Sequence, residues 1–175
     1  AVTGSSDADN RWSVRDMNAA IELGQLFWLR DHGRIHVTDP ADTAFAAFSA
    51  LAGLVPAQHN RSEEQVELQQ FSTPLALSWI AARAAAIRSD DVVLEPSAGT
   101  GMLAIWPQTL GPKIILNEIA PLRRECLHAL FPKMSVTSHD GELIDELLAP
   151  APLPSVVLIF PPFSVGRGSS RRLMP

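Results

Sequence analysis

The stretch Val92–Leu103, VVLEPSAGTGML, is the most informative part of this sequence. A short apolar run leads into an acid, a proline and a glycine-rich turn, after which apolar residues resume. A continuous apolar run of this length, bounded by turn residues, is typical of a strand that is buried on both faces. Glycines directly after such a strand allow a tight turn and the close approach of a ligand. The stretch therefore predicts a strand, a ligand-binding loop and a following helix.

Strand and helix patterns alternate along the rest of the chain. Three further strands are predicted at 113–118, 134–140 and 155–160, and the segments 120–131 and 141–149 between them have helical composition. This alternation is typical of βαβ units and predicts an α/β fold, a doubly wound, Rossmann-like, mainly parallel sheet with helices on both faces. Only four strands can be identified, so the sheet is expected to be truncated after the fourth.

The first third of the chain is predicted to be helical. Ser13 and Asp16 have the spacing of a capping box, and the apolar side chains from Met17 to Leu29 fall mostly on one face of the helix that follows. Asp39 and Pro40 predict the start of a second helix, and Thr73 with Pro74 that of a third, which ends near Arg88. The expected organisation is a disordered lead-in (1–10), a helical extension (11–60), the α/β domain (61–163) and a flexible tail (164–175).

Composition limits the function classes that remain. The net charge is −5, so the chain itself supplies little of the positive charge that dominates nucleic-acid affinity. Cys126 is the single cysteine, which excludes an internal disulfide and favours a reducing, cytoplasmic location. The five histidines have no metal-ligand spacing, and no metal site is predicted. No apolar run is long enough to cross a membrane.

Polar residues at the ends of the predicted strands indicate the ligand. Glu118 follows the second strand, 19 residues after Gly99, where an acid can accept hydrogen bonds from two ribose hydroxyls. Residues 99–104 also fit the dinucleotide fingerprint G-x-G-x-x-A. Glu95 has the wrong charge to face a pyrophosphate and suits a ligand with a positive group, such as S-adenosylmethionine. An NAD-binding oxidoreductase remains an alternative.

The stretch VLEPSAGTG resembles the E/D-P-x-x-G-x-G motif of class I S-adenosylmethionine-dependent methyltransferases, in the form found among N6-adenine methyltransferases. Four more stretches resemble motifs of this family in the same order, namely QQFSTP, LNEIAP, SHDGEL and FPPF. The resemblance covers about residues 65–163. The motif sequences are most similar to those of plasmid- and phage-type methylases, including those fused to strawberry-notch-like helicases. It implies that 61–163 is the N-terminal part of such a domain.

The resemblance implies S-adenosylmethionine as cofactor and adenine in DNA or RNA as substrate. The implied cofactor-binding residues are Phe71, Thr73, Pro74, Glu95, Pro96, Ser97, Ala98, Gly99, Thr100, Gly101, Glu118, Ile119, Asp140 and Gly141. The implied catalytic motif is Phe160, Pro161, Pro162 and Phe163. Asp140 also fits an ordinary Asp-Gly turn before a helix, Asn117 is interpreted as incidental, and Trp79 and Trp106 as core.

One position departs from the family pattern. The family has Asn or Asp before the double proline, where its side-chain oxygen accepts a hydrogen bond from the amine that is methylated. Phe160 has no acceptor, so half of that clamp is missing. Two hypotheses remain open: a methyltransferase that is impaired, or a remnant that binds cofactor, or a partner through the helical extension, without turnover.

Overall fold

A computed structural model of the chain describes residues 13–32, 35–52, 73–148 and 152–160. The predicted lead-in and tail lie outside the described residues, as do Phe71 of the cofactor set and Pro161, Pro162 and Phe163 of the catalytic motif. These predictions are not tested by the structure. No helix among the described residues is both long and apolar enough to cross a membrane.

The described strands form one parallel sheet. They are β1 (Val92–Glu95), β2 (Lys113–Asn117), β3 (Ser135–Thr137) and β4 (Val156–Val157), arranged in the order β3-β2-β1-β4. The chain runs outward from β1 to β3 and then returns to the other side of β1. The predicted α/β fold with four parallel strands is therefore confirmed. The reversal between β1 and β4 is the kind of switch point beside which open α/β sheets bind ligands, at the carboxyl ends of the strands.

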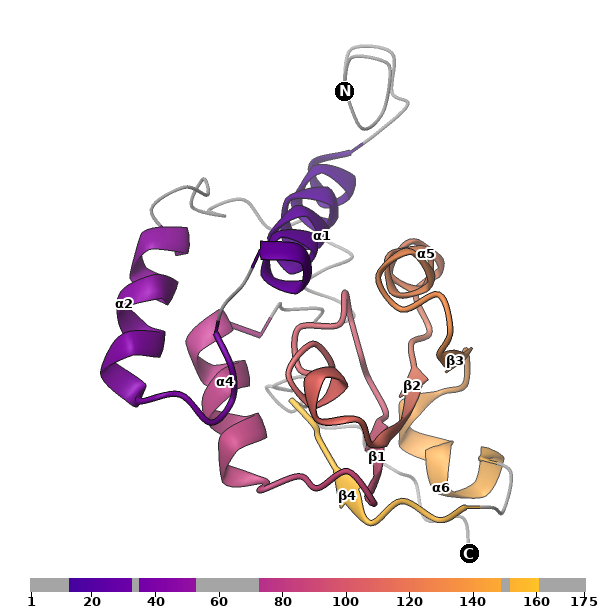
Figure 1. Cartoon of the computed structure of the whole chain (residues 1–175). Coiled ribbons are helices and arrows are strands. Elements are labelled where there is room, and N and C mark those ends of the chain that lie inside the picture. Colours follow the sequence, from indigo (N-terminus) through magenta and orange to yellow (C-terminus); the bar gives the residue numbers. More distant parts are fainter. Residues whose placement is uncertain (1–12, 33–34, 53–72, 149–151, 161–175) are drawn as a thin grey trace, which may run out of the picture.

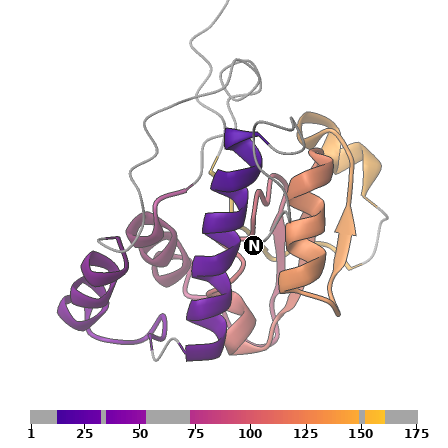
Figure 2. The same cartoon turned by 90° about the horizontal axis from the view of Figure 1, so that it is seen from above.

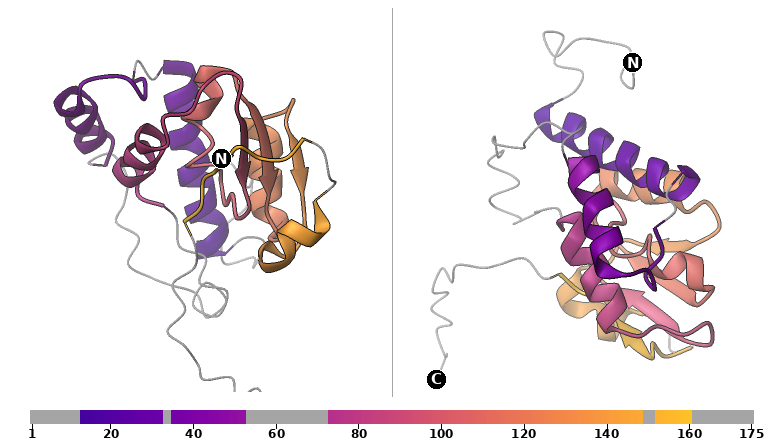
Figure 3. Two further views of the ribbon diagram at one scale, coloured as in Figure 1. Left: turned by 90° about the horizontal axis from the view of Figure 1, so that it is seen from below. Right: turned by 60° about the vertical axis from the view of Figure 1, so that its left-hand side comes forward.

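Helices lie on both sides of this sheet. They are α1 (Val14–His32), α2 (Ala41–Ala52), α4 (Leu75–Ala84), α5 (Pro121–Leu130) and α6 (Ile144–Leu147), with short 3₁₀ helices η2 (Pro107–Leu110) and η3 (Gly141–Leu143). Figures 1 and 2 show α1 and α5 side by side over one face, with α2 and α4 beyond α1. α6 lies on the opposite side, as expected when the connection returns from β3 to β4 (Figure 3).

The second face of the sheet is covered only in part by the described residues. Val157 and Ile159 each remain 54% exposed on or beside β4. Between β3 and β4 the described residues form only the short 3₁₀ helix η3 and the helix α6, which has four residues and lies near β2 and β3 (Figure 1). Helices thus lie on both faces as predicted, and within the described residues the cover of the second face is sparse beside β4.

One apolar cluster joins the N-terminal helices to the sheet. It contains Leu26 and Leu29 of α1, Trp79 of α4, Val93 of β1 and Leu127 of α5. Trp79 and Trp106 are both buried, which confirms their interpretation as core residues. The helix α1 is anchored further by the Arg30 guanidinium, whose Nη1 donates to the carbonyl of Leu130 at 3.1 Å.

The buried face of α1 differs from the predicted one. Met17 at the start of the predicted apolar face is exposed, whereas Asn18 and Glu22 are buried in line with Leu26 and Leu29. The spacing of these four residues places them on one helical stripe. Contact with α5 and the sheet decides which side chains of α1 are buried. The pattern of apolar residues in the sequence does not show where these contacts lie.

Two predicted helix boundaries are also corrected. The segment after the glycines turns irregularly and forms only η2, because Pro107 has no N–H to donate and β2 begins six residues later. The helix α4 ends at Ala84 rather than near Arg88, and Ala86 has a φ of 47° that no α-helix accommodates. Pro74 precedes α4, and the Thr73 side chain does not cap it.

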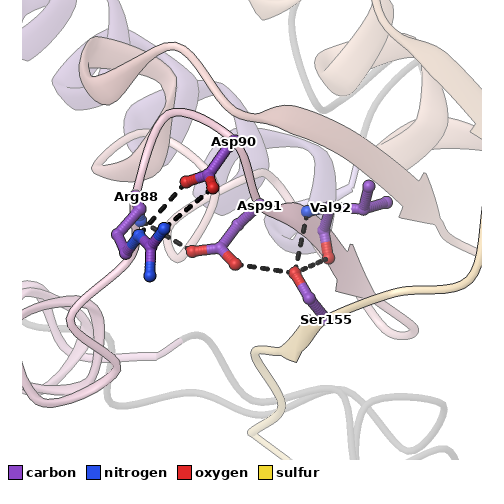
Figure 4. Close-up of polar contacts among 5 residues, drawn as sticks. All are labelled: Arg88, Asp90, Asp91, Val92 and Ser155. Carbon is purple, nitrogen blue, oxygen red and sulfur yellow. Dashed lines mark hydrogen bonds and ion pairs between the residues drawn. The ribbon is translucent and has the colours of Figure 1, made fainter.

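A polar latch joins the amino ends of β1 and β4, at the edge opposite the loop (Figure 4). The hydroxyl of Ser155 donates to Asp91 Oδ1 at 2.7 Å and accepts from the N–H of Val92 at 3.0 Å. The N–H of Ser155 donates to the Val92 carbonyl at 2.9 Å. Arg88 pairs with Asp90 beside this latch at 2.8 Å. The latch holds β4 in register with β1.

Candidate functional site

The predicted loop, Pro96–Gly101, follows β1 at the carboxyl edge of the sheet. Gly99 and Gly101 have φ values of 57° and 100°, which side chains rarely adopt, so both predicted turn positions require glycine. A Cβ on Gly101 would lie 2.7 Å from the Phe131 ring and 3.1 Å from Leu127. The missing side chain at Gly101 therefore makes room for the end of α5, whereas sequence reasoning attributed it to the approach of a ligand.

Three N–H groups of the loop have acceptors within the protein. Ala98 donates to the carbonyl of Asn117 at 2.8 Å, and Gly101 donates to the carbonyl of Ala98 at 2.9 Å. Gly99 donates to Glu118 Oε2 at 2.7 Å. A phosphate-binding loop offers such N–H groups to the anion. Here they are already used, and the acceptor at Gly99 is itself an anion.

Glu118 supports the loop from the end of β2. Its side chain is buried, with Oε2 bonded to Gly99 N–H and Oε1 accepting from the N–H of Ala120 at 2.8 Å. A carboxylate has about four acceptor positions, so these bonds leave acceptor capacity on both oxygens. The predicted ribose acid thus lies beside the loop, 19 residues from Gly99 in sequence, and holds it in place.

Glu95 is the electrostatic anomaly of the site. It ends β1, is 2% exposed, and its Oε2 has no hydrogen-bond partner among the described residues. Burial raises the pKa of Glu95 well above its usual 4.5, and the Glu118 carboxylate adds to the rise, while a hydrogen bond from the Ala104 backbone opposes it. Buried polar groups are normally satisfied. An unpartnered carboxyl oxygen at this edge indicates a place for a hydrogen-bond donor.

Glu22 of α1 reaches the same loop and was missed by sequence reasoning. It is 5% exposed, and its Oε2 accepts from the Thr100 hydroxyl at 3.0 Å. The signal available in the sequence was its spacing, since Glu22 stands four residues before Leu26 and seven before Leu29. A charged residue on the buried stripe of a helix requires a polar partner.

Asn117 is not incidental, contrary to its interpretation from the sequence. It is 1% exposed, and its amide donates to the carbonyls of Pro96 and His139 at 2.9 and 3.0 Å. Its Oδ1 accepts from the Thr137 hydroxyl and from the His139 N–H, both at 2.8 Å. One side chain therefore ties together the ends of β1, β2 and β3.

The other predicted cofactor residues at the strand ends differ in their contacts with the loop. Asp140 accepts from the N–H of Glu142 at 3.0 Å and caps η3, which fits the turn alternative. Gly141 approaches the loop closely, because a Cβ there would lie 3.1 Å from the Pro96 carbonyl. Ser97 and Ile119 are exposed.

The remaining predicted residues lie before α4 and after β4. Thr73 and Pro74 lie directly before α4, which is tied to the segment after the loop by a bond from Trp106 Nε1 to Ser78 Oγ at 2.8 Å. Phe160 is half-buried and packs against the apolar core. It follows β4, whose pairing with β1 extends to a bond from the Leu158 N–H to the Leu94 carbonyl at 2.9 Å.

Each of three buried carboxylates is thus at or next to one short loop: Glu22 and Glu118 bond to it, and Glu95 precedes it. They do not converge on a point, and no group of three His, Cys, Asp or Glu side chains among the described residues could hold a metal ion. The Arg123 guanidinium lies near Gly99, where a Cβ would be 3.7 Å from its Nη1. Two acidic side chains therefore bond to the loop, and one guanidinium lies beside it.

The chain was compared with known protein families, curated proteins and solved structures. No protein-family model and no curated protein matches the chain. Among solved structures, it is similar to a protein from Pyrococcus horikoshii described as a "putative RNA methyltransferase", with 24% identity and a TM-score of 0.40. The match covers 59% of this chain and 54% of that one, so the chain corresponds to about half of that protein's length. A likeness of this extent assigns no activity to the chain.

Proposed function

We propose that this chain binds S-adenosylmethionine as part of a methyltransferase domain, with the cofactor at the carboxyl edge of β1 and β2. The observation that carries the proposal is the unpartnered, buried Oε2 of Glu95. The amino group of S-adenosylmethionine is a cation with three N–H donors, and its sulfonium is a second positive centre. A donor of this kind satisfies the oxygen and compensates the burial of its charge.

The charge around the loop supports the same ligand. Glu22, Glu95 and Glu118 are all at most 5% exposed. Carboxylates are rarely buried without compensation, because removing an ion from water costs several kcal/mol. A positively charged ligand lowers that cost at Glu95, while Glu118 keeps acceptor capacity for ribose hydroxyls.

The dinucleotide alternative is disfavoured by the hydrogen bonds of the loop. A pyrophosphate would require free N–H donors and the N-terminus of a helix directly after the glycines. The N–H groups of Ala98, Gly99 and Gly101 are used internally, and the residues after the loop form only a short 3₁₀ helix. The literal match to the fingerprint therefore lacks the geometry that gives the fingerprint its function.

The substrate that the motif resemblance favours is the N6 amino group of adenine in DNA or RNA. A second candidate is a cofactor-binding chain without turnover, which Phe160 favours. This residue packs against the core and offers no hydrogen-bond acceptor to an amine. Poor orientation of the reacting nitrogen commonly costs on the order of 100-fold in rate.

Calorimetry with S-adenosylhomocysteine, S-adenosylmethionine and NAD tests the cofactor. We expect both sulfur compounds to bind and NAD not to bind. Glu95→Gln should weaken S-adenosylmethionine binding about ten-fold or more, because a charge-assisted bond is lost. Glu146→Gln, at an exposed acid of α6, is the matched control and should leave affinity unchanged. Binding of NAD alone would refute the proposal.

Methyl transfer separates the two candidates. The chain is incubated with labelled S-adenosylmethionine and unmethylated DNA or RNA, and incorporation is measured beside the Phe160→Asn variant. Incorporation by either chain supports the enzyme. Cofactor binding with no incorporation by both supports the non-catalytic candidate.

A further inference from the structure

The Gly99-Thr100-Gly101 segment has one side chain by which it can be held. Both glycines have positive φ, and their freedom makes such a turn mobile unless other contacts fix it. Thr100 stands between them and is buried, with its hydroxyl bonded to Glu22 of α1, 78 residues away in sequence. The loop is therefore held by Glu118 at a backbone N–H and by Glu22 at a side chain.

The helix α1 is a firm support for this contact. Arg30 fixes its end to the carbonyl of Leu130, and Leu26 and Leu29 are buried in the same apolar cluster as β1. Figures 1 and 2 show α1 running along α5 above the sheet. Position 22 points from this helix to the loop.

A carboxylate is an unexpected residue for mere packing at this position. Glu22 is 5% exposed, and burying its carboxylate costs more free energy than burying an apolar side chain of similar size. A charged acceptor does form a stronger and more directional bond to a hydroxyl than a neutral one does. The bond thus fixes geometry at a residue flanked by two flexible ones.

We propose that Glu22 is a positioning residue for the cofactor loop: it orients Thr100 and so sets the affinity for cofactor from outside the sheet. The inference rests on the proposed function for the identity of the ligand. It gives the N-terminal helix a direct part in the site, although the first third of the chain carries none of the recognised motifs.

The test is a double-mutant cycle in the 175-residue chain. Glu22→Ala, Thr100→Val and their combination remove the bond, whereas Glu22→Gln and Thr100→Ser retain an acceptor and a donor. The first readout is the affinity for S-adenosylhomocysteine by calorimetry. The second is hydrogen exchange of the Gly99 and Gly101 amides by NMR, without ligand. Met17→Ala is the control, since Met17 is an exposed apolar residue of the same helix.

We expect Glu22→Ala and Thr100→Val each to weaken cofactor binding by about ten-fold. Each should also speed hydrogen exchange of the Gly99 and Gly101 amides by about ten-fold. The double variant should lose no more than Glu22→Ala alone, because Glu22→Ala already removes the bond to Thr100. Glu22→Gln and Thr100→Ser should stay within about three-fold of the unmodified chain. Met17→Ala should leave both the affinity and the amide exchange unchanged.

Three outcomes overturn the inference. They are unchanged amide exchange in Glu22→Ala, additive losses in the double variant, and a Glu22→Gln chain as impaired as Glu22→Ala. Should Glu22→Ala fail to fold, the pair Thr100→Val and Thr100→Ser carries the same test. Absence of binding in the unmodified chain would instead refute the proposed function, and amide exchange would then decide whether Glu22 holds the loop.

Discussion

At the scale of single residues, Gly99 and Gly101 look equivalent in the sequence and are not equivalent in the fold. Both have positive φ, but only Gly101 faces the packed end of α5, where an added Cβ would lie 2.7 Å from the Phe131 ring. At Gly99 the nearest atom to an added Cβ is the tip of Arg123, at 3.7 Å. One glycine is required by backbone conformation alone, and the other by conformation and packing.

This difference predicts unequal losses of stability. Gly99→Ala should lower the free energy of unfolding by about 1–2 kcal/mol from the left-handed backbone. Gly101→Ala should lower it by about 2–4 kcal/mol, because a steric clash adds to the strain. Urea titration measures both. Adding Phe131→Leu to Gly101→Ala should recover part of the loss, and equal losses for the two glycines would contradict the packing role.

Asn117 shows how one amide can organise three strand ends. Its two N–H donors and its carbonyl all have partners within the protein, a combination that no other side chain of similar size can reproduce. Replacement by Asp removes both donors and places a carboxylate against two carbonyl oxygens.

Asn117→Asp is therefore expected to destabilise the protein by about 3 kcal/mol or more at pH 7. The loss should be smaller at pH 5, where an introduced acid of raised pKa is protonated and can donate one bond again. Thermal unfolding at the two pH values measures this. A loss that does not depend on pH would contradict the part assigned to the ionised form of the introduced acid.

At the scale of elements, β4 is held at its start by side chains as well as by the sheet. Its two residues make few ladder bonds, and the Ser155 latch adds three hydrogen bonds to Asp91 and Val92 (Figure 4). A short strand at the edge of a sheet is prone to local opening. The latch limits that opening at the edge opposite the loop.

Ser155→Ala should therefore loosen β4 and little else. Exchange of the Leu158 amide, which is bonded to the Leu94 carbonyl, should rise roughly two- to ten-fold. The amide of Glu118, bonded to Thr137 on the β3 side, is the internal control and should not change. Equal changes at both amides would mean that the latch supports the whole sheet.

At the scale of the whole molecule, the site has an electrostatic cost that appears as a dependence of stability on pH. The pKa of Glu95 is raised in the folded chain by burial and by Glu118. The folded state therefore holds a proton that the unfolded state releases. The contribution of Glu95 to stability is thus greatest below the usual value of 4.5 and declines as pH rises toward the raised pKa. The pKa of Asp91 is lowered by hydrogen bonds from the Arg88 backbone and Ser155. The contribution of Asp91 to stability is therefore lost only as pH falls below the usual pKa of an aspartate, outside the range in which Glu95 acts.

Glu95→Gln should remove this decline. Between about pH 5 and 8, unfolding temperatures of the unmodified chain are expected to fall relative to those of the variant, and the variant should be the more stable at pH 8. S-adenosylmethionine should stabilise the unmodified chain more than the variant over the same range. Parallel pH profiles for the two chains would show that Glu95 is not the buried acid responsible.

The sequence by itself determined the alternation of strands and helices, the four parallel strands and the loop after β1. It also predicted the capping box of α1, where Asp16 accepts from the Ser13 N–H at 2.7 Å and Ser13 Oγ accepts from the Asp16 N–H at 3.3 Å. These features depend on local periodicity, turn residues and contacts three residues apart, all of which are visible in a single sequence.

Only the tertiary structure decided what surrounds the loop. The bond from Thr100 to Glu22 spans 78 residues, and that from Asn117 to the Pro96 carbonyl spans 21. The unpartnered state of Glu95 and the packing against Gly101 likewise depend on elements brought together from distant parts of the chain. A side chain's role in such contacts is set by what the fold places against it, and residue type and spacing do not contain that information.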